Sequence, residues 1–106
     1  MAVYPDKVSE SMSRTSRALL TNATVVGPGP WIARDDINTS FSVTTSGSAT
    51  VDIEVSIDGV NAVLTAPLTI TLAAAGTDGD LIRGAWSWVR ANVTALVGTV
   101  TVTMGS

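Results

Sequence analysis

Histidine and cysteine are both missing from this chain of 106 residues. Without cysteine, the chain can form no disulfide and carry out no thiolate chemistry. Without histidine, it lacks the commonest general base and metal ligand of proteins. No glycine-rich phosphate-binding pattern occurs either. These absences argue against an enzyme, and we expect no catalytic residue, no cofactor and no metal site.

Charge is also scarce, because only 14% of the residues are charged, against the ~25% that is usual in soluble domains. The 9 acidic and 6 basic residues give a net charge of −3. The single lysine and the scattered arginines form no basic stripe, which argues against direct nucleic-acid binding. No apolar run approaches the ~20 residues that cross a bilayer, and no signal-peptide pattern is visible. A weakly charged surface suggests that partner proteins cover part of it.

Strand-like alternation of apolar and polar residues is abundant from Arg17 onward. Seven or eight short runs, spaced by roughly ten residues, are separated by Gly, Pro, Asn, Asp and Ser. No alternation of strands with helices is visible, which disfavours a parallel sheet. We predict a single all-β domain over residues 17–106, an antiparallel β-sandwich that is jelly-roll-like.

The clearest run, residues 50–58, predicts a strand with one buried and one wet face. The buried face is predicted to carry Val51, Ile53, Val55 and Ile57, and the wet face Asp52, Glu54, Ser56 and Asp58. Asp58-Gly59 predicts a hairpin turn that returns through residues 60–64. Residues 76–80, Gly-Thr-Asp-Gly-Asp, predict a loop. A later strand is predicted to bury Val89, Ala91, Val93 and Ala95.

The acidic residues permit two weak chemical hypotheses. Paired carboxylates on residues 52–58 are in principle what glycoside hydrolysis needs. Asp78 and Asp80 could contribute oxygen ligands to calcium, but the further ligands of an EF-hand loop do not follow. A solvated strand face and a Gly/Asp turn explain both sets without chemistry.

Residues 1–16 differ from the rest of the chain, because they are rich in serine and show no strand period. Pro5 disfavours a helix at Tyr4. We interpret the segment as an extended N-terminal arm. A frayed terminus is the alternative, and the spacing of Tyr4, Val8 and Met12 also permits one or two helical turns. In an assembly, Tyr4, Pro5, Val8 and Met12 are the residues expected to contact a partner.

Two of the three tryptophans, Trp86 and Trp88, lie in the stretch WSWVRANVTAL. If the valines of this strand point inward, both indoles share the outer face with Arg90. Three hypotheses follow: the indoles fill the rim of the core, stack on sugar rings, or bury against a neighbouring chain, where Trp and Arg are favoured. Assembly is the interpretation we favour, with Trp31 packing across from them.

The segments VDIEVSIDGVNAVLTAPLTITL and AWSWVRANVTALVGTVTVTM, within residues 48–104, resemble a small β-domain of structural proteins in tailed bacteriophages. That pattern has an acidic–aliphatic strand that ends in a DGVN turn. An aromatic-x-aromatic-Val-Arg-Ala-Asn strand then precedes a Thr/Val-rich strand. Such domains occur in head decoration (cement) proteins, tail components and fibres.

The resemblance implies a non-enzymatic virion protein, and one β-domain with an arm is most similar to a capsid cement protein. It implies binding to the major capsid protein, self-association as a homodimer or homotrimer, and a place on the capsid surface after assembly in the bacterial cytoplasm. No nucleic acid and no membrane is expected as a partner. The alternative is a tail or baseplate component with a carbohydrate- or receptor-binding β-domain.

Overall fold

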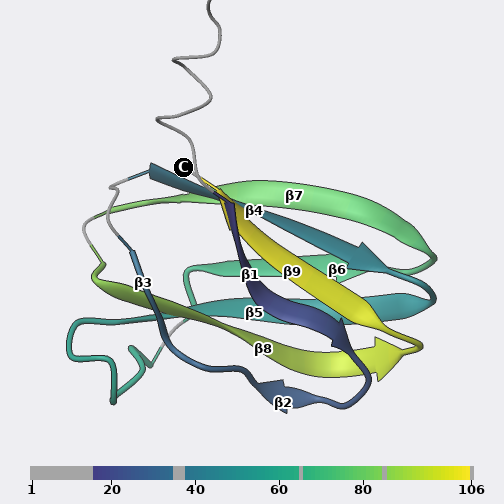
Figure 1. Ribbon diagram of the computed structural model, residues 1–106, viewed down its shortest axis with the longest axis horizontal. Coiled ribbons are helices and arrows are strands. Elements are labelled where there is room, and N and C mark those ends of the chain that lie inside the picture. Colours follow the sequence, from purple (N-terminus) through teal and green to yellow (C-terminus); the bar gives the residue numbers. More distant parts are fainter. Residues whose placement is uncertain (1–15, 35–37, 65, 85, 106) are drawn as a thin grey trace, which may run out of the picture.

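The computed structural model describes residues 16–34, 38–64, 66–84 and 86–105 (Figure 1). These ranges contain nine β-strands, which confirms the all-β prediction. The strands are β1 (Ser16–Ala23), β2 (Gly27–Pro28), β3 (Ile32–Ala33), β4 (Asn38–Thr45), β5 (Ser48–Ser56), β6 (Leu68–Leu72), β7 (Gly76–Arg83), β8 (Trp88–Val97) and β9 (Val100–Gly105). Within the described residues, no helix is long and apolar enough to cross a membrane. Ser16, counted above with the arm, opens β1, and residues 1–15 lie outside the described residues.

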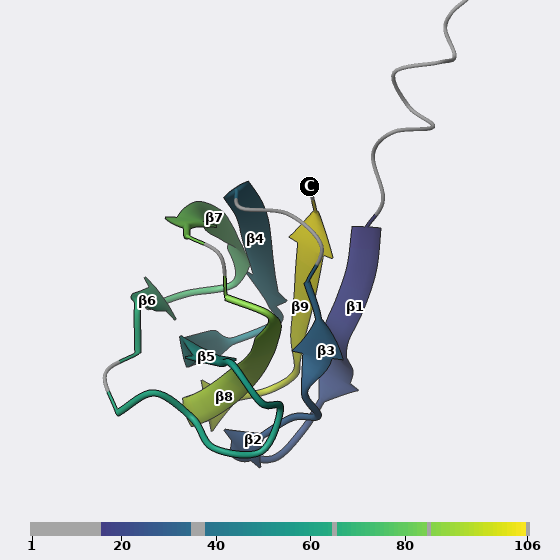
Figure 2. The same cartoon turned by 90° about the vertical axis from the view of Figure 1, so that its left-hand side faces the viewer.

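The strands form two antiparallel sheets that pack face to face (Figure 2). The first sheet has the order β1-β9-β4-β7, and the second has the order β2-β8-β5-β6, with β3 also paired to β8. The pairs are nested along the chain: β1 with β9, β2 and β3 with β8, β4 with β7, and β5 with β6. A long hairpin that wraps around itself in this way has jelly-roll topology. The predicted sandwich is therefore confirmed, and its topology is a jelly roll.

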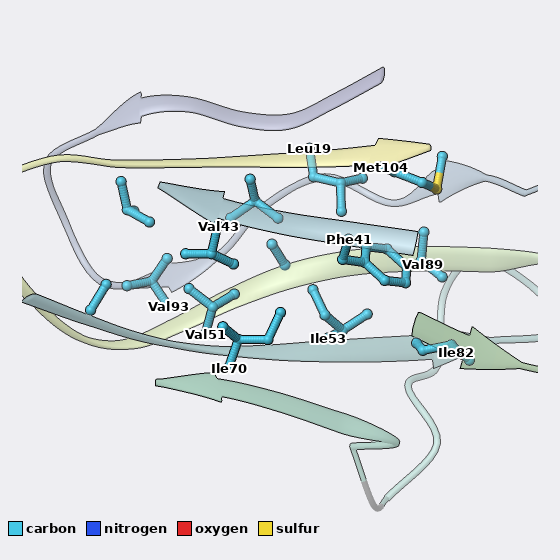
Figure 3. Packing of buried hydrophobic residues seen from close by; sticks show 14 of the residues in the cluster. Leu19, Phe41, Val43, Val51, Ile53, Ile70, Ile82, Val89, Val93 and Met104 are labelled. Carbon is cyan, nitrogen blue, oxygen red and sulfur yellow. The ribbon is translucent and has the colours of Figure 1, made fainter. Parts of the chain in front are cut away.

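The core lies between the inner faces of the two sheets (Figure 3). Phe41, the single phenylalanine of the chain, is 2% exposed and sits among aliphatic side chains of both sheets. Its neighbours in the cluster include Leu19, Val43, Val51, Ile53, Val89, Val93, Val102 and Met104. β-branched residues dominate because their branched side chains pack well on a pleated surface.

Buried and outward-facing residues alternate along β5 as far as its end at Ser56, and along β8 as far as a β-bulge at Thr94. Val51, Ile53 and Val55 are buried as predicted, but Ile57 is 71% exposed and Ser56 is buried, so both predictions were wrong. The reason is that β5 ends at Ser56, and the chain turns there.

On β8, Ala95 is exposed, which contradicts the predicted inward position. Val51 pairs with Val93 and Thr50 with Ala95, so Thr94 is an additional residue in a β-bulge. A bulge residue reverses the alternation beyond it. Leu96 consequently packs against the core in place of Ala95.

Two further segments have a secondary structure that differs from the one predicted from the sequence. Residues 76–80 belong to strand β7, which pairs with β4 in continuous register. Gly79 permits this pairing at close range, since a Cβ there would come within 2.8 Å of the Phe41 carbonyl oxygen. Residues 60–64 form no strand, and the predicted hairpin return is a loop.

The turns divide between the two ends of the sandwich (Figure 1). The β1–β2, β4–β5, β6–β7 and β8–β9 turns lie at one end, which we call the turn end. The β5–β6 loop, the β7–β8 connection and the beginning of β8 lie at the opposite end, which we call the aromatic end because Trp86 and Trp88 are there.

Gly47 offers a test of how tightly the turn end is packed. A Cβ on Gly47 would overlap the backbone carbonyl oxygen of Val97, and backbone atoms cannot move aside easily. We expect Gly47→Ala to lower the free energy of unfolding by about 1–3 kcal/mol, as overpacking does, measured by urea denaturation. Gly29→Ala is the matched control, because its Cβ would meet mainly the movable end of the Leu20 side chain. An equal loss in both variants would contradict the account.

Candidate partner-binding surface

Polar side chains on the outer face of the second sheet form a connected network. Glu54 and Arg90 stand opposite each other on β5 and β8, and the Arg90 Nε donates to Glu54 Oε1 at 2.6 Å. The other carboxylate oxygen of Glu54 accepts a hydrogen bond of 3.0 Å from Asn92 Nδ2. The Arg90 and Glu54 side chains are only 24% and 17% exposed. Partial burial strengthens such an ion pair relative to a fully solvated one.

The ring of Trp31 packs against the Arg90 side chain of this network. β3 pairs with the start of β8, with Ile32 opposite Val89, so the preceding Trp31 lies beside that strand. The guanidinium carbon of Arg90 is 4.4 Å from the centre of the Trp31 ring, which is a cation–π contact. The structure thus brings together Trp31 and Arg90, two of the residues that the sequence singled out.

Trp88 lies on the same outer face and supports the turn after β5. It stands opposite Ser56 in the register, and its ring is so close to Gly59 that a Cβ there would lie 3.0 Å from Trp88 Cε2. Gly59 has φ +74°, a left-handed conformation that favours glycine. The backbone conformation and the close approach of the indole therefore both favour glycine at position 59.

Trp86 is separated from this face, because it packs against the hydrophobic core. The expectation that it shares the outer face with Trp88 and Arg90 is therefore wrong. Its carbonyl oxygen accepts a 3.1 Å hydrogen bond from Nη1 of Arg34, a buried residue that the sequence analysis did not identify. Arg34 also donates from Nε to Thr39 Oγ1 at 2.6 Å, so it ties the start of β4 to the β7–β8 connection.

The β5–β6 loop lies at the aromatic end (Figure 2), and it carries large aliphatic side chains that are exposed. Ile57 is 71% exposed, Val60 is 73% exposed, and Leu64 is fully exposed. Three large aliphatic residues exposed within eight positions are a feature of interaction surfaces. The sequence pattern predicts a strand through residue 58 and a hairpin return over residues 60–64, so these exposed positions were not expected.

Hydrogen bonds centred on Asp58 hold the loop in shape. Asp58 Oδ1 accepts from the backbone N–H groups of Val60 and Asn61 and from Ser56 Oγ, and Oδ2 accepts from Asn61 Nδ2. These donors favour the charged carboxylate and hold the pKa of Asp58 well below its usual range. The backbone N–H of Val63 then bonds to the carbonyl oxygen of Val55 at 2.9 Å. Ser and Asp often form hydrogen bonds to the backbone of a turn, so Ser56 and Asp58 are the sequence signal that could have predicted this loop.

Each carboxylate that was a candidate for glycoside hydrolysis or calcium binding accepts a hydrogen bond or forms an ion pair within the protein. Glu54 pairs with Arg90, Asp58 closes its turn, and Asp52 Oδ1 accepts a 2.7 Å hydrogen bond from Thr69. On β7, Asp78 and Asp80 accept from the backbone N–H groups of Gly79 and Leu81. Among the described residues, no three acidic side chains are grouped so that they could hold a metal ion.

The described part of the surface therefore joins Trp31, Trp88 and Arg90 to the loop of residues 57–64. Tyr4, Pro5, Val8 and Met12 lie outside the described residues. Chemically, this surface offers apolar area and a neutralised ion pair, which suit packing against another macromolecule.

The jelly-roll class that the topology defines also occurs in a phage-related protein. The fold is similar to that of the SPBc2 prophage-derived protein YomS, whose crystal structure matches with a TM-score of 0.70 at 12% sequence identity. The match covers 87% of this chain and 90% of that one. No protein-family model matches the sequence, and no curated protein matches it. At this identity, the likeness shows a shared fold.

The Glu54–Arg90 pair gives a stability test. In Glu54→Gln, Arg90 loses its anionic partner while remaining largely buried, so we expect the free energy of unfolding to fall by about 1–3 kcal/mol, measured by urea denaturation. Asp52→Asn is the matched control on the same strand face, because its amide oxygen can still accept from Thr69. A larger loss in the control than in Glu54→Gln would contradict this assignment.

The Asp58 carboxylate gives a pH test. Its native pKa lies below the ~3.9 of an unfolded aspartate, so its contribution to stability is present above that pH. The contribution is lost as the pH falls through the native pKa. We expect NMR titration to give Asp58 a midpoint below the usual range, and Asn61→Ala to raise it by removing one donor. An ordinary midpoint in the unmodified protein would refute the network.

Proposed function

We propose that the chain is a non-enzymatic structural protein of a tailed-bacteriophage virion, which decorates the capsid and stabilises contacts between capsomers. The observation that carries the proposal is the preorganised apolar surface at the aromatic end. Three exposed aliphatic side chains stand there on a loop fixed by Asp58, beside Trp88. A surface of this kind loses little conformational freedom when it binds, so more of its apolar contact contributes to affinity.

The fold supports the phage assignment independently of the surface. A prophage-derived protein shares the jelly-roll architecture over most of both chains. Jelly rolls are also frequent among viral capsid domains. Both observations agree with the resemblance of residues 48–104 to phage structural domains.

The proposed mechanism is mechanical. The protein would bind the assembled shell through the aromatic end, with Tyr4, Pro5, Val8 and Met12 of the N-terminal arm contacting the neighbouring capsomer. Because only the assembled shell offers both contacts, binding favours that state over separated capsomers. Repetition over the shell, together with self-association of the protein, raises the strength of attachment through multivalency.

The alternative is a tail or baseplate protein that binds a carbohydrate receptor through its tryptophans. Sugar platforms need an accessible aromatic face. Here Arg90 lies over Trp31, Gly59 lies against Trp88, and Trp86 packs on the core. These contacts favour protein packing over sugar stacking.

Binding to purified shells tests the proposal. The probe is the head of the phage that encodes the chain, stripped of outer proteins, and co-sedimentation measures affinity. We expect Leu64→Asp to weaken binding tenfold or more, equivalent to about 1.4 kcal/mol, because it places a charge in an apolar contact. Deletion of residues 1–15 is expected to weaken binding as well.

The matched control is Leu81→Asp, which changes an exposed leucine of β7 in the first sheet. It should bind shells like the unmodified protein. No binding of the unmodified protein to shells, or equal loss in both leucine variants, would overturn the proposal. Glycan binding that is lost in Trp88→Ala would support the receptor-binding alternative instead.

A further inference from the structure

Among the residues that the structure describes, the four turns of the turn end carry no charge. Its four turns and the strand ends beside them consist of Ala, Val, Leu, Thr, Ser and Gly, in residues 23–27, 45–48, 72–76 and 95–100. Strand pairing gathers these segments at one end, because Ala23 and Thr45 both stand opposite Val100, Ser48 stands opposite Val97, and Thr45 stands opposite Gly76. Figure 1 shows these turns at the right-hand end of the long axis.

Much of this uncharged end is apolar and accessible. Val25 is 74% exposed, Val97 is 66% exposed and Val26 is 57% exposed. The three alanines of residues 73–75 and Ala95 are exposed as well. The β-bulge at Thr94 contributes directly, since it turns Ala95 outward. Exposed apolar side chains that gather at one end of a small protein are a feature of interaction sites.

Hydrogen bonds between two of the turns keep this surface rigid. The Ser46 backbone N–H donates to the Thr99 carbonyl oxygen at 3.1 Å, and the Thr99 N–H donates to Ser46 Oγ at 2.9 Å. Thr45 Oγ1 also donates to the Thr99 carbonyl oxygen. Polar groups of the turns are thus paired within the molecule, and contact with an apolar partner would leave these groups satisfied.

We infer that the turn end is the self-association surface, and that its partner is the turn end of a second copy. A two-fold contact places the same patch against itself, so a charged patch would repel its copy. The chain as a whole carries −3, and the four described turns of the turn end contribute none of that charge. The aromatic end is a poorer partner for it, because Asp58 and Arg83, which are exposed there, would be desolvated against apolar side chains.

The size of the end face agrees with a dimer contact. The two shorter dimensions of the molecule are 33 and 18 Å, so an end face offers on the order of 600 Å², near the ~800 Å² per partner of a standard interface. End-to-end contact also leaves the aromatic ends of both copies free. The inference deepens the self-association part of the proposed function, and mass in solution tests it with no shell present.

The experiment measures molar mass by light scattering after size exclusion, at roughly 100 μM protein, about a hundredfold above a Kd of 1 μM. We expect twice the 10.9 kDa chain mass for the unmodified protein. The double variant Val25→Glu and Val97→Glu should have the mass of a single chain. Leu64→Glu, which places one carboxylate at the aromatic end, should remain a dimer. Circular dichroism melting checks that each variant is folded.

Salt provides a second readout. An uncharged contact should persist from about 0.05 to about 1 M NaCl, whereas a contact held by ion pairs dissociates as salt rises. A single-chain mass for the unmodified protein would overturn the inference, as would a folded double variant that stays dimeric. Loss of the dimer in Leu64→Glu would overturn the end-to-end arrangement. Shell binding that fails while the dimer forms would remove the proposed function and leave this inference standing.

Discussion

Burial of the inner faces of β4, β5, β8 and β9 around Phe41 is the interaction on which the rest of the structure depends. Each of these central strands has a strand on both sides, so its inner residues lose contact with water almost entirely. The outer face of the second sheet is then free to carry the Arg90–Glu54 pair. The two ends, where the strands stop, are where apolar side chains remain exposed.

The all-β fold and most of its core were predictable from the sequence because the period-2 pattern is strong. Val51, Ile53, Val89 and Val93 lie on the inner faces that alternation assigns to them. On the outer face, the placement of Trp88 and Arg90 followed from the same rule. The strand order did not follow, because pairing between distant strands depends on contacts that local alternation does not specify.

Departures from the prediction occur where one residue changes the geometry. A single additional residue, Thr94, reverses the alternation of β8, and the turn bound to Asp58 ends β5 one position before Ile57. Glycine and aspartate in β7 resemble a loop in composition, yet continuous pairing with β4 makes them a strand. Trp31 approaches Arg90 only through the tertiary pairing of β3 with β8, which has no counterpart in local sequence.

The nesting of the jelly roll has a consequence for synthesis. β9 lies between β1 and β4, so the first strand described has no neighbour in its sheet until residues 100–105 are available. Ser16 pairs with Gly105 across 89 positions, and closing such a distance costs chain entropy before contacts compensate for it. Domains dominated by distant pairings fold slowly. During synthesis, β1 would therefore stay without its partner strand until the ribosome had released residues 100–105.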